Sequence, residues 1–199
     1  SLEPLLRNAE HNFLHNYLGL NEDAGLPLTP DCADLPYILR SYFAWKMGLP
    51  IAFRACGRGS ANTPPRCSTP TLMTEVTRNP NTPASFTQFS RKLANTVHSG
   101  SARTGLDDES TDWYPVPLRR DALWPGTIFA DPYGHILVLT EWVPQTAEQA
   151  GMLWAVDAQP DNTVTRKRVW EGTLLFADIN NAGPGFKAFR PLISTAPGQ

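Results

Sequence analysis

The chain lacks several features that would assign it to a large class of proteins. No apolar run approaches the roughly 20 residues that a membrane-spanning helix requires, so we expect no membrane span. The formal net charge is only −2, from 17 Lys and Arg against 19 Asp and Glu, which gives no electrostatic reason to expect nucleic acid as a partner. Acidic and polar residues interrupt residues 1–19, so this stretch does not resemble a signal peptide.

Cysteine is also scarce, with three residues in 199. Cys56 and Cys67 bracket a stretch rich in Gly, Ser, Asn and Pro, a composition typical of a loop. A disulfide that closes this loop would imply an oxidising compartment, whereas two reduced thiols would be ordinary in a cytosol, and the residues alone leave both open. Cys32 has no cysteine partner in either case.

The composition that remains is that of a globular protein, with 41% hydrophobic and 18% charged residues. A length of 199 residues without a clear linker predicts one domain. The spacing of apolar residues predicts helices over residues 2–18, 34–47 and 83–97. Short β-type runs predict strands over residues 51–55, 127–131, 135–142, 152–158 and 163–170, and the stretches 57–78 and 99–114 have loop composition. Helices followed by neighbouring strands predict an α+β fold, in which N-terminal helices pack on a C-terminal antiparallel sheet.

Cys32 lies just before the second predicted helix. Because proline is tolerated in a first helical turn and costly beyond it, Pro36 indicates that this helix begins within a few residues of the thiol. The positive end of a helix dipole favours a thiolate, which would make Cys32 a nucleophile. Asp31 and Asp34 either oppose that ionisation or cap the helix. A small buried apolar residue is the alternative role for Cys32.

Four histidines are candidates for the base that would serve this thiol. His11 and His15 are four residues apart on a predicted helix, but no third ligand lies close by in sequence, so we expect no metal site there. His98 follows a helical segment and is expected to cap it or to lie at the surface. His135 follows the turn-like DPYG and opens the apolar run ILVLTEW, so its imidazole can project from a sheet edge toward a helix terminus. A backbone hydrogen bond at the strand end is the alternative role for His135.

Asp157 ends another apolar run, MLWAVD. A carboxylate at the end of a buried strand can hold an imidazole in one orientation and stabilise its charged form. A turn-forming aspartate before AQPDN is the alternative role, and Gln159 is a second candidate for the orienting group.

In chain order, Cys32, His135 and Asp157 resemble the catalytic residues of the circularly rearranged cysteine enzymes of the papain-like superfamily. One branch that fits is the NlpC-like family of cell-wall endopeptidases. Its motifs resemble YLG at 17–19, DCADL at 31–35, LWPGTIF at 123–129 and GHILVL at 134–139. The spacing from Cys32 to His135 is long for that family, so residues from about 57 to 112 would be an insertion.

The transglutaminase-like family is the second branch that fits. DCADLPYILRSYFAWKMGLPIAFRA resembles its pattern of a nucleophilic cysteine, a helix and G-[ILV]-P-A-R, and WAVDAQP resembles the stretch around its third catalytic residue. The usual H-[AS]-W stretch is replaced by GHILV, and Gln159-Pro160 also departs from that family's pattern.

Both resemblances imply the same roles: Cys32 as the nucleophile, His135 as the base and Asp157 as the residue that orients it. They imply a single papain-like domain over residues 1–199 that needs no cofactor. The expected reaction is hydrolysis of an amide bond in a peptide or peptidoglycan-type substrate, by a secreted or periplasmic protein. Acyl transfer to an amine and an inactive binding domain of the same fold are the alternatives. The stretch from residue 57 to 114, which ends in Trp113 and Tyr114, is expected to wall or cap the substrate groove.

Overall fold

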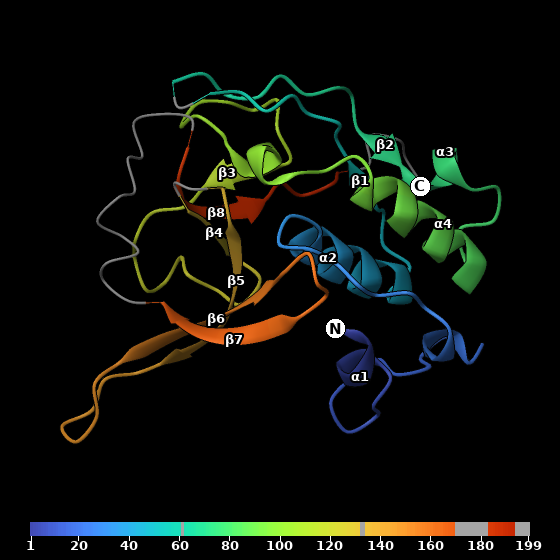
Figure 1. Cartoon of the computed structure of the whole chain (residues 1–199), viewed down its shortest axis with the longest axis horizontal. Helices are drawn as coiled ribbons and strands as arrows, with labels where there is room; N and C mark the ends of the chain where they lie inside the picture. The colour runs from blue at the N-terminus through green and yellow to red at the C-terminus, as the bar shows by residue number, and fades with distance from the viewer. Residues whose placement is uncertain (61, 132–133, 170–182, 194–199) are drawn as a thin grey trace.

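The fold, a computed structural model, is described for residues 1–60, 62–131, 134–169 and 183–193 (Figure 1). The helices are α1 Glu3–Leu6, α2 Asp34–Lys46, α3 Met73–Val76 and α4 Pro83–Ala94, with 3-10 turns at Glu22–Ala24 and Ser99–Ala102. The strands are β1 Ala52–Phe53, β2 Thr71–Leu72, β3 Trp113–Pro115, β4 Ile128–Ala130, β5 Ile136–Val143, β6 Met152–Ala158, β7 Val164–Val169 and β8 Gly185–Phe189.

The largest assembly of strands is a six-stranded sheet in the order β3-β8-β4-β5-β6-β7, and each strand in it is antiparallel to its neighbours. β1 and β2 form a separate antiparallel pair. The register places Val138 of β5 opposite Val156 of β6, and Asp157 of β6 opposite Thr165 of β7. The predicted α+β class with an antiparallel C-terminal sheet is therefore confirmed for the described residues.

Helix α2 lies at the centre of the fold, between the sheet and α4 (Figure 1). Of the apolar stripe predicted for this helix, Leu35, Ile38 and Tyr42 are buried, whereas Leu39 and Phe43 are partly buried. Trp45 is buried as well. Their cluster also contains Phe86, Phe89 and Leu93 of α4, together with Ile128, Ile136 and Val138 of the sheet. Burial on both sides fixes the position of α2, so the residues at its N-terminus have a defined place relative to the sheet.

A buried ionic cluster attaches the N-terminal segment to α2. Nζ of Lys46 lies 2.5 Å from Oε1 of Glu22 and 2.7 Å from Oδ2 of Asp23, and these side chains are almost completely buried. Burial alone would raise the pKa of Glu22, but the hydrogen bonds from Lys46 and from the backbone outweigh it and lower that pKa to about 2. Tyr42 also donates its hydroxyl to Oδ1 of Asp23 at 2.6 Å. The charges are paired and hydrogen-bonded, which is what makes their burial tolerable.

The predicted helix over residues 2–18 is wrong, because the helix ends at Leu6 and turns follow it. Asparagine side chains explain the difference. Oδ1 of Asn8 accepts the N–H of Glu10 at 2.8 Å, and Oδ1 of Asn12 accepts the N–H of Leu14 at 3.1 Å. Asn16 has a left-handed backbone with φ of 49°. Such local bonds compete with the helical hydrogen-bond ladder and favour turns.

The prediction of loops for residues 57–78 and 99–114 is also wrong in part. The first stretch contains β2 and α3, and the second contains a 3-10 turn and the start of β3. Trp113 of β3 is fully buried, stacks on Phe189 of β8 with 3.7 Å between ring centroids, and donates its indole N–H to the hydroxyl of Tyr37 at 3.0 Å. These contacts link β3 to α2. Strand β8 was not predicted, and Trp170, the last residue of the strand predicted over 163–170, lies outside the described residues.

Candidate active site

Cys32 lies in the turn that leads into α2, and its side chain is a partly exposed, free thiol. Asp31 organises this turn: its Oδ1 accepts the N–H groups of Ala33 at 2.8 Å and Asp34 at 3.0 Å, and its carbonyl accepts the N–H of Leu35 at 3.0 Å. The expectation that an acid caps the helix is therefore confirmed for Asp31. Among the described residues, the N–H of Cys32 has no hydrogen-bond acceptor, so it is available to a bound group.

Asp34 has a different environment from Asp31. Its carboxyl is buried, and within the described part of the chain its Oδ1 has no hydrogen-bond partner. Burial, followed by the nearby charge of Asp31, raises the pKa of Asp34 to about 7. The carboxyl of Asp34 is therefore only partly ionised near neutral pH.

His135 lies just before β5, where the sequence predicted it. Its N–H donates to Oδ1 of Asp131 at 2.9 Å, and the N–H of Asp131 donates to its carbonyl at 2.9 Å, so a closed turn holds the residue. Nε2 of the imidazole lies 2.7 Å from Oδ2 of Asp157. The side chain of Cys32 is close enough to the ring to raise its pKa. Because Nε2 already contacts the carboxylate, Nδ1 is the nitrogen that remains for the thiol.

These two partners change the charge of the imidazole. The interaction with Cys32 raises the pKa of His135, burial opposes that change, and Asp157 adds to it, with the result that the pKa is about 9. The ring is therefore cationic at neutral pH. A cationic imidazole next to sulfur is the arrangement in which a thiolate is stabilised and a proton is held ready for a leaving group.

Asp157, on β6, is fully buried and receives hydrogen bonds from several side chains. Oδ2 accepts from His135, from Gln159 at 2.9 Å and from Lys167, and Oδ1 accepts from Thr165. Burial alone would raise the pKa of this carboxyl, but the bonds from Lys167, Thr165 and His135 outweigh it and lower the pKa to about 2. Asp157 is thus a fixed anion across the ordinary pH range.

Three of the side chains that bind Asp157 have roles that the sequence did not predict. Gln159, considered as a substitute for Asp157, supports that carboxylate instead of replacing it. Thr165 and Lys167, two residues apart on β7, were not identified as candidates. Only the pairing register of β6 with β7 could have revealed them, since Thr165 lies directly opposite Asp157.

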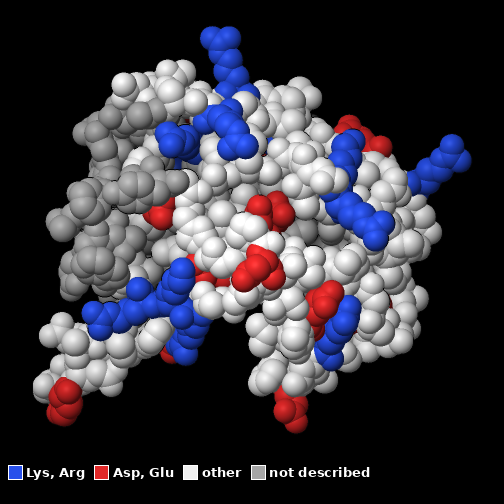
Figure 2. All heavy atoms as spheres, viewed as in Figure 1, with Lys and Arg blue, Asp and Glu red and all other residues white. Residues whose placement is uncertain are grey.

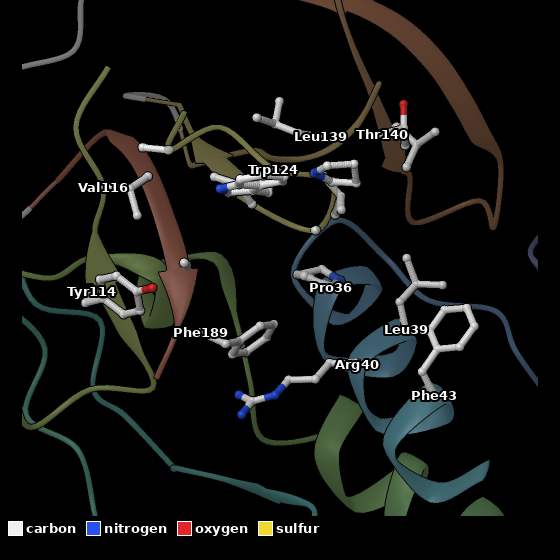
Figure 3. Close-up of a pocket in the computed structure, with 17 residues that line it drawn as sticks. Pro36, Leu39, Arg40, Phe43, Tyr114, Val116, Trp124, Leu139, Thr140 and Phe189 are labelled. Atoms are coloured by element: carbon white, nitrogen blue, oxygen red, sulfur yellow. The ribbon is translucent and has the colours of Figure 1, made fainter. Parts of the chain in front are cut away.

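A cavity of about 640 Å³ adjoins the elements that carry the three residues (Figure 3). Pro36 lines it one helical turn, about 5.4 Å along the axis, beyond Cys32. Val138 and Val156 line it from β5 and β6, the strands that follow His135 and carry Asp157. In Figure 3, Trp124 and Leu139 lie across the cavity from Leu39 and Phe43 of α2.

The last two residues of the stretch 57–114, which was expected to wall or cap a substrate groove, lie in different places. Tyr114 lines the cavity, whereas Trp113 belongs to the core. Cys32, His135 and Asp157 do not themselves line this cavity, whose apolar walls suit an apolar part of a ligand.

The remaining histidines lie apart from this site. His11 and His15 are in the N-terminal turns, and the described residues contain no group of three or more side chains that could hold a metal. Nε2 of His98 contacts the carbonyl of Cys56 at 2.9 Å, so it supports the loop and not the thiol of Cys32. Cys56 and Cys67 form a disulfide, the first of the two arrangements that the sequence left open.

On the face drawn in Figure 2, the charged side chains of the described residues do not form a large patch of one sign that would indicate a particular class of partner. Acidic and basic side chains are interspersed there, apart from basic side chains that gather over β7. None of the helices in the described residues is long and apolar enough to cross a membrane. No protein-family model, curated protein or solved structure matches the chain.

Proposed function

We propose that the protein is a papain-like cysteine hydrolase that cleaves an amide bond in a cell-wall-type peptide. The observation that carries the proposal is the imidazole of His135, which is hydrogen-bonded to the buried carboxylate of Asp157 and has its pKa raised by the nearby side chain of Cys32. Nucleophile, base and orienting acid in this order are the parts that acyl transfer through a thiol requires.

In the first half of the reaction, the sulfur of Cys32 attacks the amide carbon, and the carbonyl electrons move to oxygen. The N–H of Cys32, which has no acceptor among the described residues, is a donor for that oxyanion. The N–H groups of the next three residues already bind Asp31, so they are not available. As the C–N bond breaks, His135 gives its proton to the leaving amine, and a thioester on Cys32 remains.

In the second half, His135 is neutral and accepts a proton from water, whose oxygen attacks the thioester. The C–S bond breaks, the acid product leaves, and the proton on His135 restores the starting pair. Asp157 keeps Nε2 protonated throughout, which holds Nδ1 toward the sulfur.

The compartment and the substrate class of the proposal have separate support. The Cys56–Cys67 disulfide favours a secreted or periplasmic protein, because such bonds persist in oxidising compartments. The apolar cavity next to α2 gives the acyl part of a peptide a place to bind. The motifs at 31–35 and 134–139 resemble those of cell-wall endopeptidases.

The test is turnover of peptidoglycan-type peptides by the wild-type chain and by Cys32→Ala, with products identified by mass spectrometry. We expect Cys32→Ala to lose at least about 10³-fold in rate while its thermal midpoint changes little. An added primary amine separates hydrolysis from acyl transfer, since it gives an amide product only in the second case. Full turnover by Cys32→Ala would show that the nucleophile is misassigned. Binding without turnover by the wild type would instead indicate a binding domain.

A further inference from the structure

A second hollow adjoins the cavity between α2 and the sheet. It encloses about 710 Å³ and shares Trp124, Pro125 and Thr140 with that cavity as walls. Arg120, Glu141 and Trp142 line its other parts. We call this hollow the tryptophan groove. Because three residues belong to both, a ligand in the tryptophan groove lies next to whatever occupies the first cavity.

Two indole rings dominate the tryptophan groove, and both are exposed. Trp124 is 66% exposed and Trp142 is 37% exposed, so both indoles are accessible to a ligand. Trp124 is nevertheless fixed, because its Nε1–H donates to the carbonyl of Asp121 at 2.8 Å. Its polar edge is thus occupied by its own loop. What it presents to the groove is a flat apolar face.

Polar groups of both signs lie around these faces. The guanidinium of Arg120 lies over one face of the Trp142 ring, 5.7 Å from its centroid, and Asp121 and Glu141 line the same groove. Both acids have cationic partners, since Asp121 pairs with Arg119 at 3.3 Å and Glu141 with Arg166 at 2.5 Å. Their oxygens can still accept further hydrogen bonds, because an ionised carboxylate has about four acceptor sites.

This combination selects among classes of ligand. The two indoles offer flat apolar faces, while Arg120, Asp121 and Glu141 offer hydrogen-bond donors and acceptors beside them. A pyranose ring matches both features: its axial C–H bonds form an apolar face that stacks on an indole, and its hydroxyls donate and accept at the ring edge. We propose that the tryptophan groove is an oligosaccharide-binding site.

The proposal also specifies the substrate of the neighbouring site, and this part rests on the proposed hydrolase function. A sugar chain held by Trp124 and Trp142 would place a peptide branch in the cavity that α2 and the sheet enclose. The favoured substrate is then a peptide still attached to its glycan, and not a free peptide.

The experiment measures binding without catalysis. A tetramer of N-acetylglucosamine is titrated calorimetrically into the Cys32→Ala chain, which cannot turn over, and into the same chain with Trp124→Ala or Trp142→Ala. We expect saturable binding that each tryptophan substitution weakens about two- to tenfold. Tyr17→Ala is the matched control, because Tyr17 is an aromatic residue that is 59% exposed and lies in the N-terminal segment. Circular dichroism verifies that each variant is folded.

Three results would overturn the proposal: no binding of the tetramer, equal binding by both tryptophan variants and the control, or displacement of the sugar by an apolar tetrapeptide at the same concentration. The last result would identify the groove as a peptide site. The sugar contains no peptide bond that the proposed hydrolase would cleave. A failure of the sugar to bind would therefore not contradict the proposed hydrolase function. Conversely, an inactive wild-type chain would leave the binding result unchanged.

Discussion

Nε2 of His135 lies 2.7 Å from Oδ2 of Asp157, a carboxylate that is fully buried and 22 positions away in sequence. The two residues reach each other because β5 and β6 are antiparallel neighbours in the sheet. The pKa of the same imidazole is raised by the side chain of Cys32, from the turn before α2. The candidate site is thus formed by three separate segments of the chain: the turn before α2, the turn before β5 and the end of β6.

The first prediction concerns pH. Because the pKa of His135 is raised from 6.5 to about 9, its charged form is stabilised by the fold. This stabilisation is fully present below pH 6.5 and is lost as the pH rises through about 9. As the pH rises, we expect kcat/KM to fall with an apparent pKa of about 9. In Asp157→Asn, this alkaline limb of the pH profile should move to lower pH. The difference in thermal midpoint between wild type and His135→Gln should shrink over the same interval. An unchanged limb in Asp157→Asn would contradict the assignment.

The second prediction concerns Lys167, which shares Oδ2 of Asp157 with His135. A second cation on that oxygen opposes the positive charge of the imidazole. Lys167→Met should therefore move the alkaline limb of kcat/KM to higher pH, in the direction opposite to Asp157→Asn. Arg168→Met, on the neighbouring position of β7, is the control and should leave the limb in place. A shift to lower pH in Lys167→Met would show that the lysine positions the carboxylate more than it competes for it.

The third prediction concerns the buried cluster under α2. Lys46→Met leaves Glu22 and Asp23 buried without their cation, so we expect a loss of about 3–5 kcal/mol in the free energy of unfolding. Arg119→Met removes an exposed partner of Asp121 and should cost no more than about 1 kcal/mol. Urea unfolding of both variants checks the difference. Equal losses would mean that the buried cluster does not hold the N-terminal segment on α2.

The fourth prediction concerns the Cys56–Cys67 disulfide, which closes a loop with a sequence separation of 11. The double variant Cys56→Ser, Cys67→Ser should lose about 2–3 kcal/mol of stability, because its unfolded state is less constrained. Intact-mass spectrometry with and without reductant should show a gain of two hydrogens in the wild type and none in the double variant. Two free thiols in protein isolated without reductant would contradict the structure.

The parts of the fold that follow local rules were predictable from the sequence. Helix α2 combines a proline in its first turn with a buried apolar stripe, and β5 and β6 are continuous apolar runs, so each was found with nearly correct bounds. Strand β8 was missed, because glycine and a buried lysine, Lys187, interrupt its apolar pattern. The N-terminal helix was overextended, because helical spacing takes no account of asparagine side chains that bind their own backbone.

The residues of the candidate site also divide into those that the sequence could identify and those that it could not. Cys32, His135 and Asp157 stand at element ends, and such positions can be read from one chain. The support of Asp157 by Thr165 and Lys167 depends on the β6–β7 register. That register follows from a turn in which Asn162 has φ of 67° and the N–H of Gln159 donates to the carbonyl of Thr163. A shift of one residue would exchange the faces of β7, and no sequence pattern specified this turn conformation.

The most direct test is the rate at which iodoacetamide alkylates Cys32, followed by mass spectrometry at about pH 6, below the ordinary titration range of a thiol. If His135, backed by Asp157, ionises the sulfur, the wild type reacts readily at that pH, and His135→Ala reacts at least about tenfold more slowly, with Asp157→Asn in between. Equal, slow alkylation of the wild type and His135→Ala would contradict the account, because the imidazole would then have no influence on the thiol it contacts.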